Sequence, residues 1–331
     1  MHTMKLIKSL GRTGNSLLCV VNAIIFAMEH DIAVVDFTEL HWWTSQLLPK
    51  GENELINNLQ INISPSDLNK VYEMRGLEFH DYIHKIKPAI KWNKTINKFE
   101  SWFCGFYVNV GTFEERRYVV QKYISPILNI PSLKNEDMIN SNDLLIHLRS
   151  GDIFSNRGHY AYIQPPLSFY IEVISSRTWN KIIIITENEH NPCFSKLTEK
   201  YPNIISFLHN KQERSGGNGN GFQHDLSWLI NCTHYVACQS SLCPLIIQLS
   251  KTIKHVYLPS YILKTTGQNI IKETRIWWTN EFANKNTNFT NGNVEYHVFD
   301  YDKYIDIPKK IYEYKENDNI SYLLEYNKTK T

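Results

Sequence analysis

Three side chains that bind or transfer charge are gathered in one short stretch, residues 147–152, which reads His-Leu-Arg-Ser-Gly-Asp. The apolar run before it, 144–146, is typical of a buried strand. Arg149 is therefore expected near the carboxyl end of a strand, and open α/β sheets bind ligands outside those ends. A guanidinium is always charged and offers an anion a bidentate fork. We expect Arg149 to hold a diphosphate.

The chain around this stretch alternates between strand and helix patterns. Apolar runs predict strands at 144–147, 182–186, 204–207, 235–238 and 255–258. Apolar residues at helical spacing predict helices at 166–175, 191–200, 226–231 and 242–250. Strands that alternate with helices at this spacing indicate a parallel sheet covered by helices on both faces.

The N-terminal part begins in the same style. A strand is predicted at 4–10, a glycine turn at 11–14, a helix whose apolar residues repeat between 17 and 28, and a strand at 32–35. A further helix is predicted at 112–123. The aromatic segment between them, 38–110, fits core and inter-domain packing or a sugar-stacking acceptor cleft, because aromatic rings serve both purposes. The sequence therefore predicts a second α/β domain, N-terminal to the one that contains residues 144–258.

Three blocks of the chain together resemble the fucosyltransferase superfamily, which comprises α1,2-, α1,6- and protein O-fucosyltransferases. Residues 147–152 resemble its His-x-Arg-x-Gly-Asp motif, and 11–15, Gly-Arg-Thr-Gly-Asn, resemble its glycine turn. Residues 225–241 resemble its later block, in which an aspartate opens a helix, a strand follows, and a Ser-Ser pair closes onto the nucleotide. The blocks occur in the family's order, and the remaining C-terminal portion has no counterpart.

The resemblance implies an α/β fold of the GT-B type, in which two Rossmann-like domains with parallel sheets face a central cleft. Residues 1–140 would form the acceptor-side domain, and 141–265 the domain that binds the nucleotide-sugar. Residues 266–331 would form a C-terminal extension whose packing the sequence does not predict.

The resemblance also implies roles for individual residues. Arg149 would neutralise the departing diphosphate, His147 and Asp225 would hold the base, and Ser240 and Ser241 would donate to phosphate. Asp152 would orient the loop or the arginine, or act as a general base. The cleft between donor and acceptor would be lined by Gly14, Asn15, Arg12, His159 and Tyr160.

The residue types alone leave plainer interpretations open for the same positions. Arg149 and Asp152 can form a local ion pair, and His147 can be a satisfied core histidine. Asp225 and Ser241 can be simple helix N-caps, a role that both residue types favour. Arg157, His159, Tyr160 and Glu187 are further candidates for acid–base chemistry on the neighbouring loops.

The expected activity is the inverting, metal-independent transfer of fucose from GDP-fucose to a glycan hydroxyl, with no cofactor. Ser150 departs from the pattern, because many family members carry a second arginine there. Transfer of another sugar such as xylose or galactose, or a non-catalytic carbohydrate-binding role, therefore stays open. A rival motif, Asp300-Tyr301-Asp302, fits the Asp-x-Asp of metal-dependent transferases, but it lies far from any strand that the sequence predicts.

The bulk properties exclude several other classes. A net charge of +2 without a basic block argues against a dedicated nucleic-acid binder. No apolar stretch reaches the ~20 residues of a membrane span, and the N-terminus lacks the layout of a signal peptide. We expect a cytoplasmic protein, or a Golgi one if an N-terminal anchor was removed. The 6 cysteines form no zinc pattern and are expected to be buried and reduced.

Overall fold

The chain folds into two compact units. The computed structural model describes residues 3–6, 13–29, 32–37, 60–64, 90–93, 98–101, 111–128, 130–134, 138–151, 164–208, 220–238, 240–260, 262–267, 270–275 and 288–300. The first unit comprises Met1–Ser132, Gln212–Ser227 and Ser241–Lys251, and the second comprises Leu133–Lys211, Trp228–Ser240 and Thr252–Thr331. Each unit contains its own sheet, and each is described by itself.

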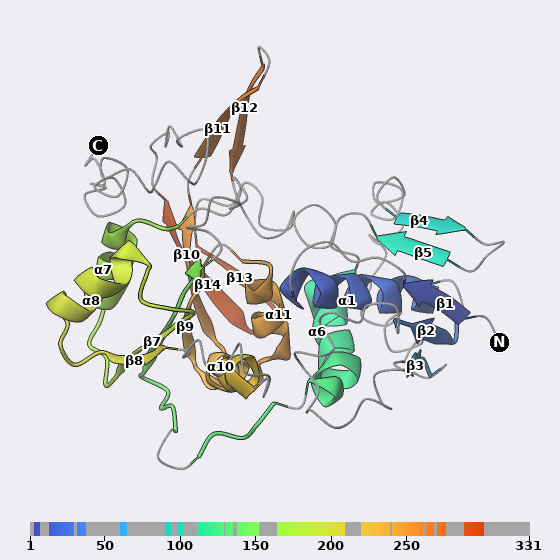
Figure 1. Cartoon of the computed structure of the whole chain (residues 1–331), viewed down its shortest axis with the longest axis horizontal. Helices are drawn as coiled ribbons and strands as arrows, with labels where there is room; N and C mark the ends of the chain where they lie inside the picture. The colour runs from blue at the N-terminus through green and yellow to red at the C-terminus, as the bar shows by residue number, and fades with distance from the viewer. Residues whose placement is uncertain are drawn as a thin grey trace. The chain divides into compact units, whose positions relative to one another are not determined.

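The second unit is built on a sheet of 7 strands (Figure 1). The strands are β6 (Leu144–Leu148), β7 (Ile182–Thr186), β8 (Ile205–Leu208), β9 (His234–Val236), β10 (His255–Ser260), β13 (Phe289–Asn291) and β14 (Val294–Asp300). Their spatial order is β13-β14-β10-β9-β6-β7-β8. All neighbours are parallel except β13, which runs antiparallel to β14. The parallel strands, counted along the chain, lie in the order 3-2-1-4-5-6 of doubly wound nucleotide-binding sheets.

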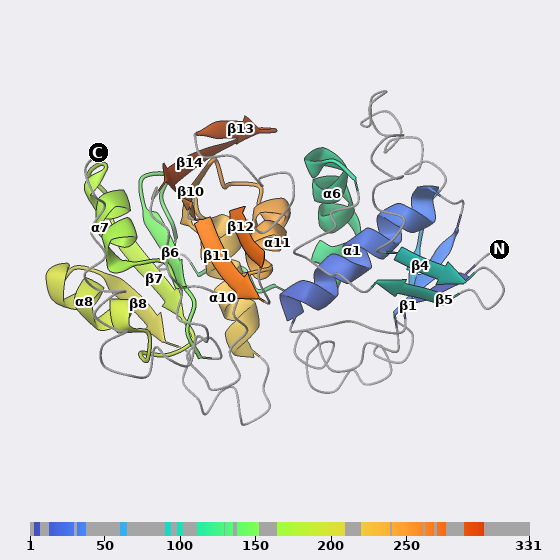
Figure 2. The ribbon, with the colours of Figure 1, turned by 90° about the horizontal axis from the view of Figure 1, so that it is seen from above.

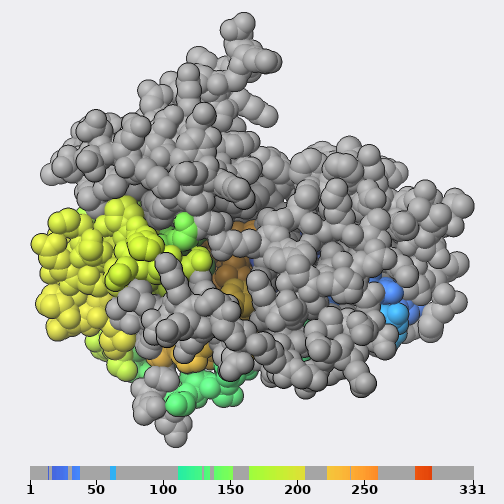
Figure 3. All heavy atoms as spheres, in the orientation of Figure 1, coloured from blue at the N-terminus to red at the C-terminus, as the bar shows by residue number. Residues whose placement is uncertain are grey.

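Two helices, α7 (Leu167–Ser175) and α8 (Pro192–Lys200), lie beside β6, β7 and β8 (Figure 2). Alternate residues of β6, such as Leu144 and Ile146, join Phe169, Tyr170 and other helix residues in one apolar core. Because side chains alternate across a strand, His147 points to the opposite face from this core. Residues 164–208 form a contiguous yellow-green surface in Figure 3.

The first unit contains a sheet of 5 strands in the order β3-β2-β1-β5-β4. They are β1 (Thr3–Leu6), β2 (Val34–Asp36), β3 (Gln60–Asn62), β4 (Ile90–Asn93) and β5 (Lys98–Ser101). The central pairs β1–β2 and β1–β5 are parallel, and the two edge pairs are antiparallel. Helix α1 (Thr13–Glu29) connects β1 to β2, so the predicted β-turn-α-β opening is confirmed for the described residues.

Three more helical segments belong wholly or partly to the first unit. Helix α6 (Phe113–Val119) begins with a capping box between Thr112 and Glu115 and continues into a π-helical turn, Val120–Ile124. Helix α11 (Leu242–Leu249) packs against α1 and α6. The buried Arg116 guanidinium donates to Asn22 Oδ1 of α1 over 2.6 Å, which joins α6 to the same core. The first part of helix α10 (Asn220–Asn231), up to Ser227, also falls in this unit.

The α/β class predicted from the sequence is confirmed, and the five strands predicted between 144 and 258 are all present. The helix predicted at 226–231 begins earlier, at Asn220. The C-terminal portion contributes β13 and β14 to the second sheet, and it forms the antiparallel hairpin β11 (Ile262–Gly267) and β12 (Ile270–Arg275). The expectation that no strand precedes Asp300 is wrong, because β14 runs directly into it.

The cysteines that the structure describes are buried and free, as expected from their apolar surroundings. Burial raises the pKa of Cys193 to about 12 and raises the pKa of Cys232 as well, so both are protonated thiols at neutral pH. Cys104 lies outside the described residues. In the described part of the chain, no helix combines the length and apolar character needed to cross a bilayer.

Candidate active site

The sheet of the second unit has a topological switch point between β6 and β9. These neighbours pair in parallel from Leu144↔His234 to Ile146↔Val236, but the chain leaves β6 toward β7 and leaves β9 toward β10, on opposite sides. Connections that diverge in this way leave a crevice at the carboxyl ends of the two strands, where doubly wound sheets bind their ligands. Residues 147–151 and residues 237–238, which follow β9, both lie at these ends.

His147 lies at this carboxyl end of β6. It is half-buried, and its Nδ1 is 3.0 Å from the hydroxyl of Tyr235 in β9. A ring nitrogen of His147 also lies within 4.8 Å of the Cys238 sulfur. The residues after β9 therefore approach the end of β6, and Ser240, two residues beyond Cys238, belongs to the same segment. The structure thus brings Cys238 and Tyr235 to His147 within the second unit.

Arg149 is the first residue after β6, and its backbone is anchored by a buried asparagine. The side chain of Asn191 donates from Nδ2 to the Arg149 carbonyl over 2.7 Å and to Gln164 Oε1 over 2.8 Å. Its Oδ1 accepts from the backbone N–H of Cys193, which makes Asn191 the N-cap of α8. One amide side chain therefore starts a helix and fixes the position of the arginine's backbone.

The serine and glycine of the motif are held by the residues that follow β7. Ser150 is buried and donates from Oγ to Asn188 Oδ1 over 2.6 Å. Gly151 adopts φ +71°, in the left-handed region that favours glycine. A Cβ at this position would lie 2.5 Å from Cδ of Glu187. The structure therefore places the carboxyl group of Glu187 directly against the motif, and it commits Ser150 to a structural hydrogen bond.

Two further predicted residues meet in the first unit. Gly14 is in the first turn of α1, and a Cβ there would lie 2.8 Å from the Leu242 backbone nitrogen and 3.0 Å from Ser241 Oγ. Ser241 occupies the N-cap position of α11 and is 8% exposed, but its side chain caps no backbone N–H of the helix. The starts of two helices, whose N–H groups carry partial positive charge, therefore converge at Gly14 and Ser241.

Asp225 also belongs to the first unit, and the structure corrects its predicted context. The residue is buried in the second turn of α10, because that helix begins at Asn220. The interpretations of Asp225 as the residue that opens a helix, or as a plain N-cap, are therefore wrong. Neighbouring side chains fix the helix: Gln223 donates to the Leu128 carbonyl over 3.4 Å, and Ser227 donates to the Pro131 carbonyl over 2.7 Å.

Several of the predicted site residues lie outside the described residues: Asp152, Arg12, Arg157, His159 and Tyr160. The backbone of Asn15 is part of α1, and its side chain is not described. Sequence reasoning missed Asn188, Asn191 and Gln164 as residues that position the motif. The Asn191-Pro192 pair, an N-cap residue followed by a proline at the first helical position, was the one local signal for them.

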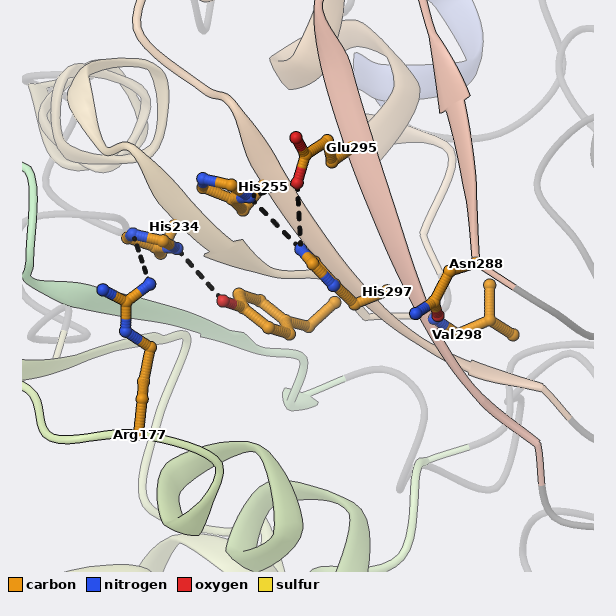
Figure 4. A network of polar contacts seen from close by, with 8 residues as sticks. Arg177, His234, His255, Asn288, Glu295, His297 and Val298 are labelled. Atoms are coloured by element: carbon orange, nitrogen blue, oxygen red, sulfur yellow. Dashed lines mark hydrogen bonds and ion pairs between the residues drawn. The ribbon is translucent and has the colours of Figure 1, made fainter.

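A second polar cluster lies at the opposite end of the same sheet, where β9, β10 and β14 begin (Figure 4). His234, His255 and His297 are close to one another there, and the ring of His234 stacks on that of His255 with centroids 4.4 Å apart. Burial, together with repulsion from His255 and Arg177, lowers the pKa of His234 to about 4. Burial also lowers the pKa of His297 and raises that of Tyr257. His234 is therefore neutral at pH 7.

No protein-family model and no curated protein matches this chain, so the residues and their geometry carry the functional argument.

Proposed function

We propose that the chain is a glycosyltransferase that transfers fucose from GDP-fucose to a glycan hydroxyl with inversion and without a catalytic metal. The observation that carries the proposal is the position of His147, Arg149 and Gly151, from the His-x-Arg-x-Gly-Asp segment, beside the switch point of a 3-2-1-4-5-6 parallel sheet. Nucleotide ligands bind at such points in doubly wound sheets. The motif and the topology are independent of each other, and both indicate a nucleotide at the end of β6.

The chemistry requires a cation where the glycosidic bond to the diphosphate breaks. Negative charge grows on the departing phosphate while the sugar gains oxocarbenium character, by analogy with glycoside hydrolysis. We assign Arg149 to that charge, because a fixed guanidinium stabilises it without any rearrangement at the moment of reaction. Its backbone is held by Asn191, which limits the positions that the fork can adopt.

The remaining residues receive supporting roles in this proposal. His147 and Asp225 hold the guanine, and Ser240 and Ser241 donate to phosphate. The Ser241 assignment is supported by a buried side chain that caps no helix N–H and lies against the first turn of α1 at Gly14. In a GT-B arrangement the first unit would present the acceptor. Glu187, packed on Gly151, is the described carboxylate that we favour for assisting the acceptor hydroxyl.

Calorimetric titration with GDP, GDP-fucose and UDP tests the donor, and a transfer assay tests the arginine. We expect GDP to bind more tightly than UDP, and Arg149→Ala to lose about 2.7–4 kcal/mol of transition-state stabilisation, roughly 10²–10³ in turnover. Arg149→Lys should retain only part of the turnover that Arg149→Ala loses, because an ammonium lacks the bidentate fork. Lys196→Ala, which removes one positive charge from the exposed face of α8, is the matched control.

Two results would redirect the proposal. Tighter binding of UDP than GDP would favour a transferase for another sugar, an alternative that Ser150 supports, because it replaces a second arginine with a neutral side chain bound to Asn188. Binding of GDP without hydrolysis or transfer of any donor would favour a non-catalytic carbohydrate-binding protein. Unchanged turnover in Arg149→Ala would reject the assigned mechanism.

A further inference from the structure

Three potential metal ligands lie close together where β10 and β14 begin, at the end of the second unit's sheet that is opposite the proposed active site. His255 is the first residue of β10, and Glu295 and His297 are on β14, which pairs with β10 in the register His255↔Glu295 and Tyr257↔His297. Residues in register on parallel strands point to the same face of the sheet. Figure 4 shows the three side chains directed toward one another.

The distances between the three atoms match a metal site. His255 Nδ1 is 3.2 Å from His297 Nε2 and 3.2 Å from Glu295 Oε2, and the last two atoms are 3.9 Å apart. A point equidistant from the three lies about 2.0 Å from each, which is the length of Zn–N and Zn–O bonds in proteins. The two separations of 3.2 Å are close to the ~3.3 Å of tetrahedral ligands at that bond length. The third, 3.9 Å, is wider, so tetrahedral binding requires the exposed Glu295 side chain to turn toward His297.

The ligand rings are held in place by stacked partners. His255 stacks on His234 at 4.4 Å with an interplanar angle of 7°, and His297 stacks on Tyr257 at 4.9 Å with an angle of 18°. The partners bond to each other through His234 Nδ1 and the Tyr257 hydroxyl, 3.0 Å apart. Stacking on both rings limits how far His255 and His297 can rotate.

The cluster borders a cavity. His255 and His297 line a cavity of about 430 Å³ whose other walls include Arg177 and Asn288. An ion bound by two imidazoles and one carboxylate, with an open position toward solvent, corresponds to the His₂Glu set of zinc enzymes. We propose that His255, Glu295 and His297 bind one Zn²⁺ ion in tetrahedral geometry, with water or a small anion from the cavity as the fourth ligand.

Titration of the chelator-treated full chain with Zn²⁺, in competition with a chromophoric indicator, tests this site. We expect one Zn²⁺ per chain, and a loss of affinity of at least about 100-fold in His255→Ala, His297→Ala and Glu295→Gln. His224→Ala, which removes an exposed histidine of α10, is the matched control and should bind like the parent. Glu295→Gln is nearly isosteric, and its side chain is 59% exposed, so it keeps the test valid if a histidine variant fails to fold.

Co²⁺ titration supplies a second readout of the geometry. We expect the strong visible absorption of four-coordinate cobalt, shifted when azide is added because azide occupies the open position. Weak six-coordinate absorption would overturn the tetrahedral assignment. Absence of stoichiometric Zn²⁺ binding, or equal affinity in the parent and Glu295→Gln, would overturn the site itself. The inference is independent of the proposed transfer reaction, because the three ligands lie at the other edge of the sheet.

Discussion

Gly151 is the residue at which backbone conformation and site chemistry constrain each other most directly. Its φ of +71° costs an L-residue about 1–2 kcal/mol. The added methyl group would also lie 2.5 Å from Cδ of Glu187, so the carboxyl end of that side chain must move away. We expect Gly151→Ala to lose at least the conformational cost of about 1–2 kcal/mol in urea denaturation, and to weaken GDP binding because the Glu187 carboxyl group is displaced from the motif.

Gly292 offers the control for this substitution. It has φ +58° in the exposed turn between β13 and β14, so Gly292→Ala should show the conformational cost of about 1–2 kcal/mol and leave GDP binding unchanged. Equal losses in the two variants, with equal affinity for GDP, would contradict the role assigned to Glu187.

At the scale of elements, the connection from β7 to α8 acts as a support for the end of β6. Asn191 caps α8, accepts from Cys193, and donates to the carbonyl of Arg149 and to Gln164. Its replacement by alanine removes a cap worth about 1 kcal/mol and leaves buried polar partners unsatisfied, at about 1–3 kcal/mol. We expect Asn191→Ala to lower the unfolding free energy by about 2–4 kcal/mol and to raise the Kd for GDP.

A second helix cap serves as the control that distinguishes the capping role of Asn191 from its role in positioning Arg149. Thr112 caps α6 through the Glu115 backbone N–H and has no contact with the motif among the bonds of the described residues. Thr112→Ala should therefore cost about 1 kcal/mol and leave GDP affinity unchanged. If Asn191→Ala behaves like Thr112→Ala in both measurements, Asn191 is only a helix cap and does not position Arg149.

The elements that the sequence predicted well are those whose signal is local. The strands at 144–148 and 182–186 are continuous apolar runs, and both were placed within one residue. The start of α10 was missed because Gly221 follows Asn220, a pair that favours a loop, whereas contacts of Gln223 and Ser227 with distant carbonyls hold the segment helical. Tertiary contacts of this range cannot be read from local composition.

The difference between local signals and contacts between distant residues also decides which candidate site residues the sequence could indicate. Arg149 and His147 could be proposed as site residues because their motif is continuous, and Gly14 and Ser241 because the resemblance supplied them. Asn188 and Gln164 act through bonds that span more than 20 residues, with no motif to mark them. Of the proposed zinc ligands, His255 precedes Glu295 by 40 residues, and only the register between β10 and β14 brings it to Glu295 and His297.

At the scale of the whole molecule, the C-terminal portion belongs to the fold of the second unit. Strand β14 pairs with β10 along 6 residues, from His255↔Glu295 to Ser260↔Asp300. The strand is separated from β6 by β10 and β9, so it supports the sheet without adjoining the switch point between β6 and β9. Stability and nucleotide binding should therefore respond differently to changes in β14.

Tyr296 tests this separation, because it is 1% exposed and stacks on Phe289 of β13 with ring centroids 4.5 Å apart. Truncation of a buried aromatic side chain costs about 3–5 kcal/mol. We expect Tyr296→Ala to lose that amount in urea denaturation, while Thr290→Ala, on an exposed position of β13, stays within about 0.5 kcal/mol of the parent.

The affinity of folded Tyr296→Ala for GDP should match that of the parent, because distant changes in one protein are additive. GDP at 100 times its Kd should then stabilise both proteins by the same increment, about 2.7 kcal/mol, since the ligand binds only the folded unit. A loss below about 1 kcal/mol would show that β14 is not an integral strand of the sheet. A smaller increment from GDP in the variant would show that β14 and the switch point are coupled through β10 and β9.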